Sequence, residues 1–136
     1  MRQRLTLLLF VVAFGPASWV PPAVADDRPD LRRVGFRMWN ARDCRALLRD
    51  SDSLCTSGDC KALLRRSDSY CDTSDCKAIL RNADSYCRTG DCRAILRKSE
   101  SYCVSGDCRA YFRGSTSTCE TNACRAFLRG RDSDCR

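Results

Sequence analysis

Histidine is absent from the 136 residues of this sequence. Without an imidazole there is no Ser-His-Asp or Cys-His nucleophile, no histidine-bound metal ion and no side chain that ordinarily titrates near neutral pH. Aromatic residues are also scarce, at 8% of the chain, which is too little for a large hydrophobic core. The sequence therefore predicts one small domain that is stabilised by something other than a large apolar interior.

Long apolar runs are missing as well, because the longest covers only residues 5–14. This run is shorter than the roughly 20 residues that a membrane span requires. Arg2 and Arg4 precede it, and an Ala-Val-Ala motif of the signal-peptidase type follows at 23–25. We expect residues 1–25 to be a secretory signal peptide, so the protein is predicted to be exported to the periplasm or the extracellular space, with no transmembrane segment.

Cysteine, by contrast, is abundant, with 12 copies in the chain. All of them follow the predicted signal peptide, and their even number fits complete pairing in an oxidising compartment. Zinc-binding thiolates are the competing interpretation, but they are typical of cytosolic modules, and a redox-active C-x-x-C motif is absent. We therefore expect structural disulfides, no bound metal ion and no cofactor.

The cysteines divide residues 43–136 into six tandem copies of one unit. Their spacings alternate between 11 and 5 residues, so the pattern repeats every 16 residues. A unit has the form D-C-[RK]-A-x-[LF]-R-x5-C, with Ala123 in place of Asp in the last copy. A short fixed period of this kind predicts an array in which each unit packs on its neighbours. The cysteines are Cys44, Cys55, Cys60, Cys71, Cys76, Cys87, Cys92, Cys103, Cys108, Cys119, Cys124 and Cys135.

Within each unit the apolar residues follow helical spacing. One face of a helix would carry, in the fourth unit, Cys92, Ile95, Leu96, Ser99, Tyr102 and Cys103. We therefore predict a helix of about 12 residues from Cys to Cys, with the Ser/Thr and Gly, Ser or Asn residues between units ending one helix and capping the next. Polar stretches such as 67–69 are poor helix formers, so a β-coil solenoid or a small α/β fold is the alternative.

The predicted helices restrict the disulfides. The ends of a 12-residue helix lie about 16 Å apart, whereas a disulfide needs Cα atoms about 4.4–6.8 Å apart, so no helix can bridge its own cysteines. Short connections would make successive helices antiparallel neighbours. The predicted fold class is all-α, a disulfide-stapled array of six short antiparallel helices arranged as a solenoid of helical hairpins.

Two pairing schemes fit such an array. Pairing between neighbouring repeats, across the tight turns alone, would include Cys71–Cys76 and Cys103–Cys108 but would leave Cys44 and Cys135 unpaired. Nested pairing within each hairpin leaves no free thiol and is preferred. It predicts the pairs Cys44–Cys71, Cys55–Cys60, Cys76–Cys103, Cys87–Cys92, Cys108–Cys135 and Cys119–Cys124.

The spacing C-x10-C-x4-C-x10-C resembles that of twin-cysteine helical hairpins, in which an inner and an outer disulfide join two antiparallel helices. Nine residues usually separate the paired cysteines in those families, which have a single hairpin. The resemblance covers the cysteine lattice alone and implies an architecture without a shared function.

Both ends of the array differ from its middle. The last unit has Arg131 and Asp134 where other units have small or apolar residues, which is typical of a terminal capping repeat. Residues 26–42 combine five arginines with Phe36 and Trp39. We interpret this segment as an N-terminal cap on the first unit or as a basic, aromatic arm that binds a partner.

Two columns of basic residues run through all six units, and both lie on one predicted helix face. The first column is Arg45, Lys61, Lys77, Arg93, Arg109 and Arg125. The second column is Arg49, Arg65, Arg81, Arg97, Arg113 and Arg129. Most units carry an acid three residues after the second column, so ordinary surface ion pairs within a unit are one expectation. The remaining positive charge favours an acidic partner, such as an acidic protein, a glycan or lipopolysaccharide, and no motif specific for nucleic acid is present.

The repeated carboxylates do not form one singular preorganised site, so we do not expect an enzyme. The sequence favours a secreted or periplasmic, disulfide-rich repeat protein that acts as a structural or binding module for a protein or polyanionic partner through a basic helical face. The alternatives are a thiol-redox or metal-binding protein and a solenoid with a regular, ice-binding-like surface.

Overall fold

The computed structural model describes residues 39–136. In these residues six α-helices alternate with six short 3-10 helices (η), and there is no strand. The predicted all-α repeat array is therefore confirmed. The predicted signal peptide and all but the last four residues of the 26–42 segment lie outside the described residues. The elements are α1 (Ala41–Arg49), η3 (Asp52–Leu54), α2 (Gly58–Arg65), η4 (Asp68–Tyr70), α3 (Ser74–Arg81), η5 (Asp84–Tyr86), α4 (Gly90–Leu96), η6 (Glu100–Tyr102), α5 (Gly106–Arg113), η7 (Thr116–Thr118), α6 (Asn122–Arg129) and η8 (Asp132–Asp134).

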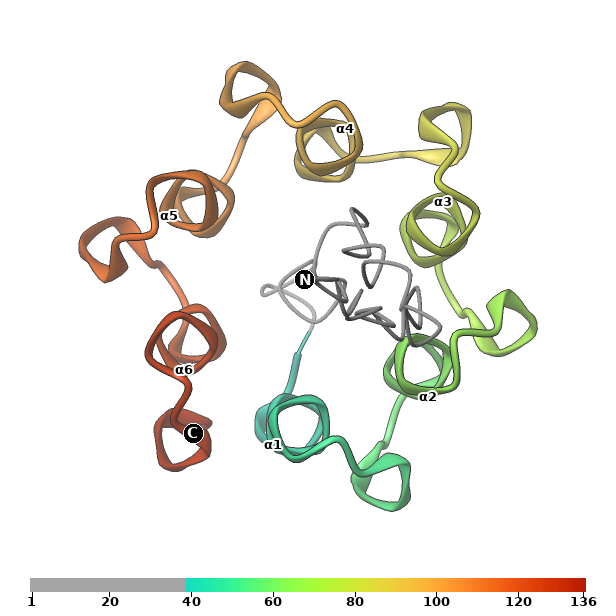
Figure 1. Ribbon diagram of the computed structural model, residues 1–136, viewed down its shortest axis with the longest axis vertical. Helices are drawn as coiled ribbons and strands as arrows, with labels where there is room; N and C mark the ends of the chain where they lie inside the picture. Colours follow the sequence, from blue (N-terminus) through green and yellow to red (C-terminus); the bar gives the residue numbers. More distant parts are fainter. Residues whose placement is uncertain (1–38) are drawn as a thin grey trace, which may run out of the picture.

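The units are arranged as a closed ring rather than as an open solenoid. Figure 1 shows the α-helices as an inner circle, seen end-on, with the η helices outside them. The last unit meets the first, because both α6 and η8 contact α1. The six units therefore complete one full turn.

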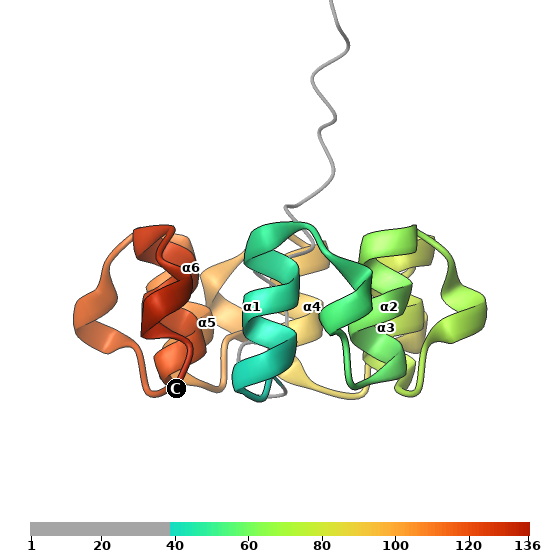
Figure 2. The ribbon, with the colours of Figure 1, turned by 90° about the horizontal axis from the view of Figure 1, so that it is seen from below.

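The α-helices run parallel to one another, which differs from the predicted antiparallel hairpins (Figure 2). At one face of the ring, Asp43 in the first turn of α1 accepts a hydrogen bond from the backbone N–H of Thr56, just before α2. At the other face, Arg65 at the end of α2 pairs with Asp52, just after α1. Each η segment lies outside the α-helices and leads the chain from the face of the ring where one α-helix ends to the opposite face, where the next α-helix begins. Successive α-helices can therefore be parallel.

Each α-helix is shorter than the predicted 12 residues. In α3 the residue after the last turn, Asn82, is left-handed with φ of 52°, and its N–H bonds to the carbonyl of Ile79. The next N–H, of Ala83, bonds to the carbonyl of Ala78 at 2.9 Å, which completes a Schellman ending. The polar residues beyond it form a 3-10 turn because their side chains compete for backbone hydrogen bonds. In the fourth unit this 3-10 turn is η6, which contains Tyr102. The predicted longer helix would have turned Tyr102 inward, whereas in the structure the side chain is 41% exposed.

The disulfides join neighbouring units around the whole ring. Three predicted pairs are present, and three are wrong, namely Cys44–Cys71, Cys76–Cys103 and Cys108–Cys135. The nested scheme required antiparallel helices, whereas in a parallel ring the end of each η segment meets the start of the next α-helix. The six bonds are Cys44–Cys135, Cys55–Cys60, Cys71–Cys76, Cys87–Cys92, Cys103–Cys108 and Cys119–Cys124.

The joint that closes the ring repeats the disulfide and the arginine–acid pair of the internal joints. Cys135 bonds to Cys44 as the corresponding cysteines do elsewhere, although 91 residues separate them in the sequence. Arg49 pairs with Asp132 at 2.6 Å, in the same way as Arg65 pairs with Asp52. The last unit is therefore not a terminal cap, since it packs against the first.

Small residues allow close packing in the core and within each unit. The alanine after each first-column residue is fully buried in every unit, as Ala46 and Ala62 illustrate. At the start of α2, a Cβ on Gly58 would lie 2.3 Å from the carbonyl oxygen of Tyr70 in the following η segment. This contact requires glycine. Trp39, from the N-terminal segment, is buried in the same core.

Candidate functional site

An aspartate holds each internal joint, and it is buried in three of the five joints and half-buried in the other two. Asp107 in α5 accepts hydrogen bonds from the backbone N–H groups of Glu120 and Thr121 at 2.6 and 3.0 Å, and from the Thr121 hydroxyl at 2.7 Å. The threonine hydroxyl in turn caps α6 by accepting a bond from the N–H of Cys124. The other aspartates that bind the next unit in this way are Asp43, Asp59, Asp75 and Asp91. Because α6 has Ala123 at this position, the joint that closes the ring lacks this aspartate contact.

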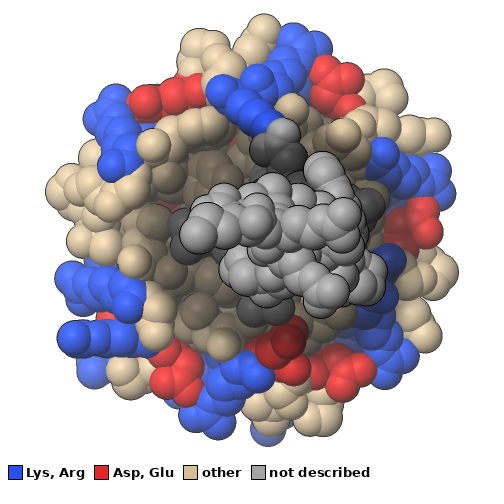
Figure 3. Space-filling model, in the orientation of Figure 1, with Lys and Arg blue, Asp and Glu red and all other residues tan. Residues whose placement is uncertain are grey.

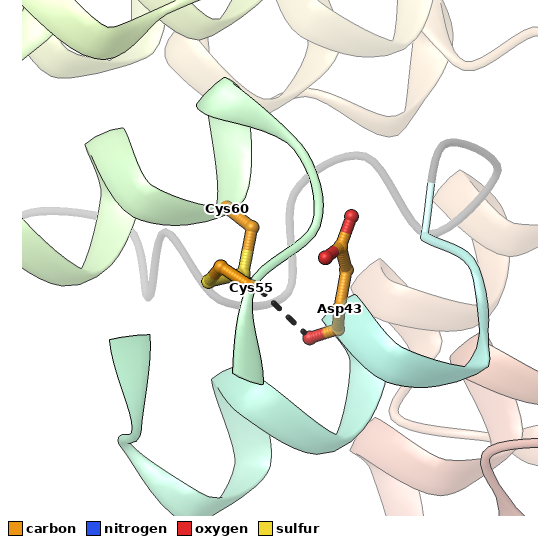
Figure 4. Close-up of side chains that lie close together, drawn as sticks. All are labelled: Asp43, Cys55 and Cys60. Atoms are coloured by element: carbon orange, nitrogen blue, oxygen red, sulfur yellow. Dashed lines mark hydrogen bonds between the residues drawn. A yellow bond between two sulfur atoms is a disulfide. The ribbon is translucent and has the colours of Figure 1, made fainter. Parts of the chain in front are cut away.

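The same aspartates lie beside the disulfides, as Figure 4 shows for Asp43, Cys55 and Cys60. One potential ligand atom from each of these three residues lies within 4.8 Å of the others, and four further joints contain an equivalent Asp-Cys-Cys group. Cysteine binds metals as a thiolate, whereas every cysteine here is in a disulfide. The carboxylate already accepts hydrogen bonds from Thr56. In this oxidised form the chemistry of the groups is that of a structural joint.

Hydrogen bonding sets the ionisation of the aspartate in the first joint. Burial by itself raises the pKa of Asp43, but hydrogen bonds from Thr56 and Ser57 outweigh burial and hold the pKa below the ordinary value. The folded ring therefore favours the charged form of this carboxyl group.

The second basic column is neutralised by acids. Five of its six arginines pair with the acid at the start of the preceding η segment, at 2.5–2.8 Å. The predicted partner was the acid of the same unit, and the ring geometry makes it the acid of the previous unit instead. The exception is Arg129, because Thr116 occupies the acidic position, and Arg129 contacts Asp134 of its own unit at 3.5 Å. The pairs are Arg49–Asp132, Arg65–Asp52, Arg81–Asp68, Arg97–Asp84 and Arg113–Glu100.

Three of these arginines also stack on a tyrosine. The guanidinium carbons of Arg65, Arg81 and Arg97 lie 4.9–5.2 Å from the ring centres of the tyrosines five residues later. Hydrogen bonds to the acid of the preceding unit and to the tyrosine raise the pKa of each arginine. These side chains form fixed acid–arginine–tyrosine rows on the surface.

The first basic column has different partners. Arg93 donates to the carbonyl of Cys87 at 3.4 Å, and Arg45 and Arg125 make the same contact with the preceding unit at 3.1 and 2.9 Å. Within the described residues, none of its six members forms an ion pair with a carboxylate. Arg45, Arg93 and Arg109 are exposed, and the other members are half-buried. This column therefore supplies positive charge that no acid of the ring neutralises.

The charges are distributed around the whole ring. In Figure 3, basic and acidic side chains alternate along its rim. Both columns recur at equivalent positions around the ring, but only the first retains unneutralised charge. The sequence prediction missed the exposed tyrosines, although the repeated Arg-x4-Tyr spacing was available as a signal, because the predicted 12-residue helix turned these residues inward.

Comparison of the chain with protein-family models, with curated proteins and with solved structures finds no match. None of the helices in residues 39–136 has the length and hydrophobicity of a membrane span.

Proposed function

We propose that this protein is an exported, non-enzymatic binding module that recognises a polyanion through its first basic column. The observation that carries the proposal is the difference between the columns: five second-column arginines pair with an acid of the preceding unit, whereas three first-column arginines contact backbone carbonyls and no first-column residue pairs with a carboxylate of the described residues. An arginine whose charge is neutralised by a neighbouring acid attracts an anionic ligand only weakly. An unneutralised column attracts one, and repetition around the ring allows several weak contacts to act together.

The chemistry of the joints supports export. Six disulfides hold the ring, and disulfides of this kind persist in oxidising compartments. The acidic polymers that such a protein meets belong to cell surfaces and the extracellular space.

Binding of inorganic polyphosphate to the full chain tests this proposal. The variant K77Q/R93Q/R109Q removes three first-column charges, and R65Q/R81Q/R97Q removes the same number from the second column. At 50 mM salt we expect the first variant to lose about tenfold or more in affinity, since a surface charge contributes up to about 1 kcal/mol, and the control to lose much less. Affinity should also fall steeply with salt. Equal losses in the two variants, or binding that is indifferent to salt, would contradict the proposal.

A further inference from the structure

The exposed large apolar side chains occupy one arc of the ring. In the described residues they fall in the first four units only, and the last two units have Thr118 and Asp134 at the corresponding η position. The backbone repeats around the whole circle, so this arc is a feature of the side chains alone. The exposed residues are Leu54, Tyr70, Tyr86, Tyr102 and Val104.

An arginine contacts each of the three tyrosine rings. Their exposed fractions are 41–47%, and one face of each ring is covered by the stacked arginine of its own unit. Arg65 and Arg97 also donate to the hydroxyl groups of Tyr70 and Tyr102 at 3.0 Å. Since each arginine is fixed by the acid of the preceding unit, a ligand that stacks on the other face of the tyrosine orders little on binding.

An unneutralised first-column cation follows each tyrosine by seven residues, in the next unit. Tyr86 is followed by Cys87, whose carbonyl accepts the hydrogen bond of Arg93 from the next unit. The repeat gives the same sequence relation between Tyr70 and Lys77 and between Tyr102 and Arg109. Three successive joints therefore carry an exposed tyrosine and a first-column cation seven residues apart, and at the joint of Tyr86 the cation contacts the backbone carbonyl of the residue after the tyrosine.

We propose that these three pairs are successive subsites for an acidic polysaccharide, whose sugar rings stack on the tyrosines while its acidic groups meet the first column. This inference rests on the proposed function and names the class of polyanion. Identical subsites in series suit a polymer of repeating units, because each added subsite binds at high effective concentration. A sugar ring presents an apolar C–H face to an aromatic ring, which a simple phosphate chain lacks. The oxidising environment implied by the disulfides favours a polysaccharide over nucleic acid.

The test compares three probes on the full chain: polygalacturonate, inorganic polyphosphate and single-stranded poly(dT). The variant Y70A/Y86A/Y102A removes the stacking surface, the corresponding triple phenylalanine variant retains it, and T118A changes the same position in a unit without a tyrosine. We expect the alanine variant to lose about tenfold or more in affinity for polygalacturonate and to bind polyphosphate as the unmodified protein does. The phenylalanine variant and T118A should retain affinity for both.

A second measurement uses the unmodified protein and does not depend on the folding of any variant. Polygalacturonate should protect Tyr70, Tyr86 and Tyr102 from nitration, as mapped by mass spectrometry, and should leave the half-buried Tyr111 unprotected. Unprotected tyrosines, or an alanine variant that binds polygalacturonate normally, would overturn the inference while leaving the proposed function intact. Tighter, tyrosine-dependent binding of poly(dT) would replace the polysaccharide with a single-stranded nucleic acid. Failure of polyphosphate to bind the unmodified protein would instead reject the proposed function.

Discussion

Cys44 and Cys135 lie 91 residues apart in the sequence, yet their Cα atoms are 5.8 Å apart, as close as those of cysteines only five residues apart elsewhere in the ring. Disulfides at equivalent positions of the ring therefore close sequence loops of very different length. This difference separates the effect of ring closure from the effect of an internal joint.

Removal of the closing disulfide should destabilise the protein more than removal of an internal one. On the chain-entropy model, C44S/C135S gives up about 4.6 kcal/mol for its long loop, whereas C71S/C76S gives up about 2 kcal/mol for its short loop. Urea unfolding of both variants under non-reducing conditions measures the difference. Equal midpoints, or a lower midpoint for C71S/C76S, would show that closure contributes no special constraint.

Asp43, the buried aspartate of the first joint, should make the free energy of unfolding depend on pH in the acidic range. Because the folded ring holds the pKa of Asp43 below that of the unfolded chain, its contribution is fully present above the unfolded pKa and is lost as pH falls through the folded pKa. We expect the free energy of unfolding to decline below about pH 4. The variant D43N, less stable at pH 7 by about 1–3 kcal/mol, should show a shallower decline. An unchanged pH slope in D43N would argue against this role.

The left-handed residue near the end of each α-helix provides a test of the backbone conformation. Gly114 has φ of 60°, and a Cβ atom at this position would have no neighbour within 4 Å, so G114A meets no steric clash with its surroundings. The substitution should still cost about 1 kcal/mol because alanine disfavours this conformation. G114N, which copies Asn82 in the third unit, should cost less. Thermal unfolding distinguishes them, and a stabilised G114A would contradict the helix ending described above.

Arg129 is the one second-column arginine without an acid in the preceding unit, so a substitution that supplies this acid should stabilise the protein. Thr116 stands where the other units have Asp or Glu, and T116D would offer Arg129 the partner that its neighbours have. We expect an increase of at most about 1 kcal/mol, because the pair is exposed. The gain should shrink at about 1 M salt, where such pairs are screened. A salt-independent change would indicate a cause other than the ion pair.

Much of the fold followed from the sequence, and the failures share one physical origin. The 16-residue period and the helix-capping residues such as Thr121 were sufficient to predict six short helices joined by disulfides. The helix ending after Arg81 was not predicted, because a left-handed Asn82 and a 3-10 turn leave no strong mark on apolar periodicity. That ending reverses the chain within each unit, which makes the helices parallel and exposes Tyr86.

The sequence predicted the residues of the two basic columns but not the acid partner of each arginine. Both basic columns were visible as repeated positions, but periodicity cannot show which acid lies opposite which arginine. The partner of Arg49 is Asp132, at the other end of the chain, and only closure of the ring brings them together. The distinction between a neutralised and an unneutralised column therefore required the tertiary structure.

Non-reducing peptide mapping of the natively oxidised protein tests ring closure most directly. We expect a disulfide-linked peptide pair that contains Cys44 and Cys135, together with five pairs that each join cysteines five residues apart. Recovery of Cys44 linked to Cys71 and of Cys108 linked to Cys135 would contradict the closed ring and restore an open array of hairpins.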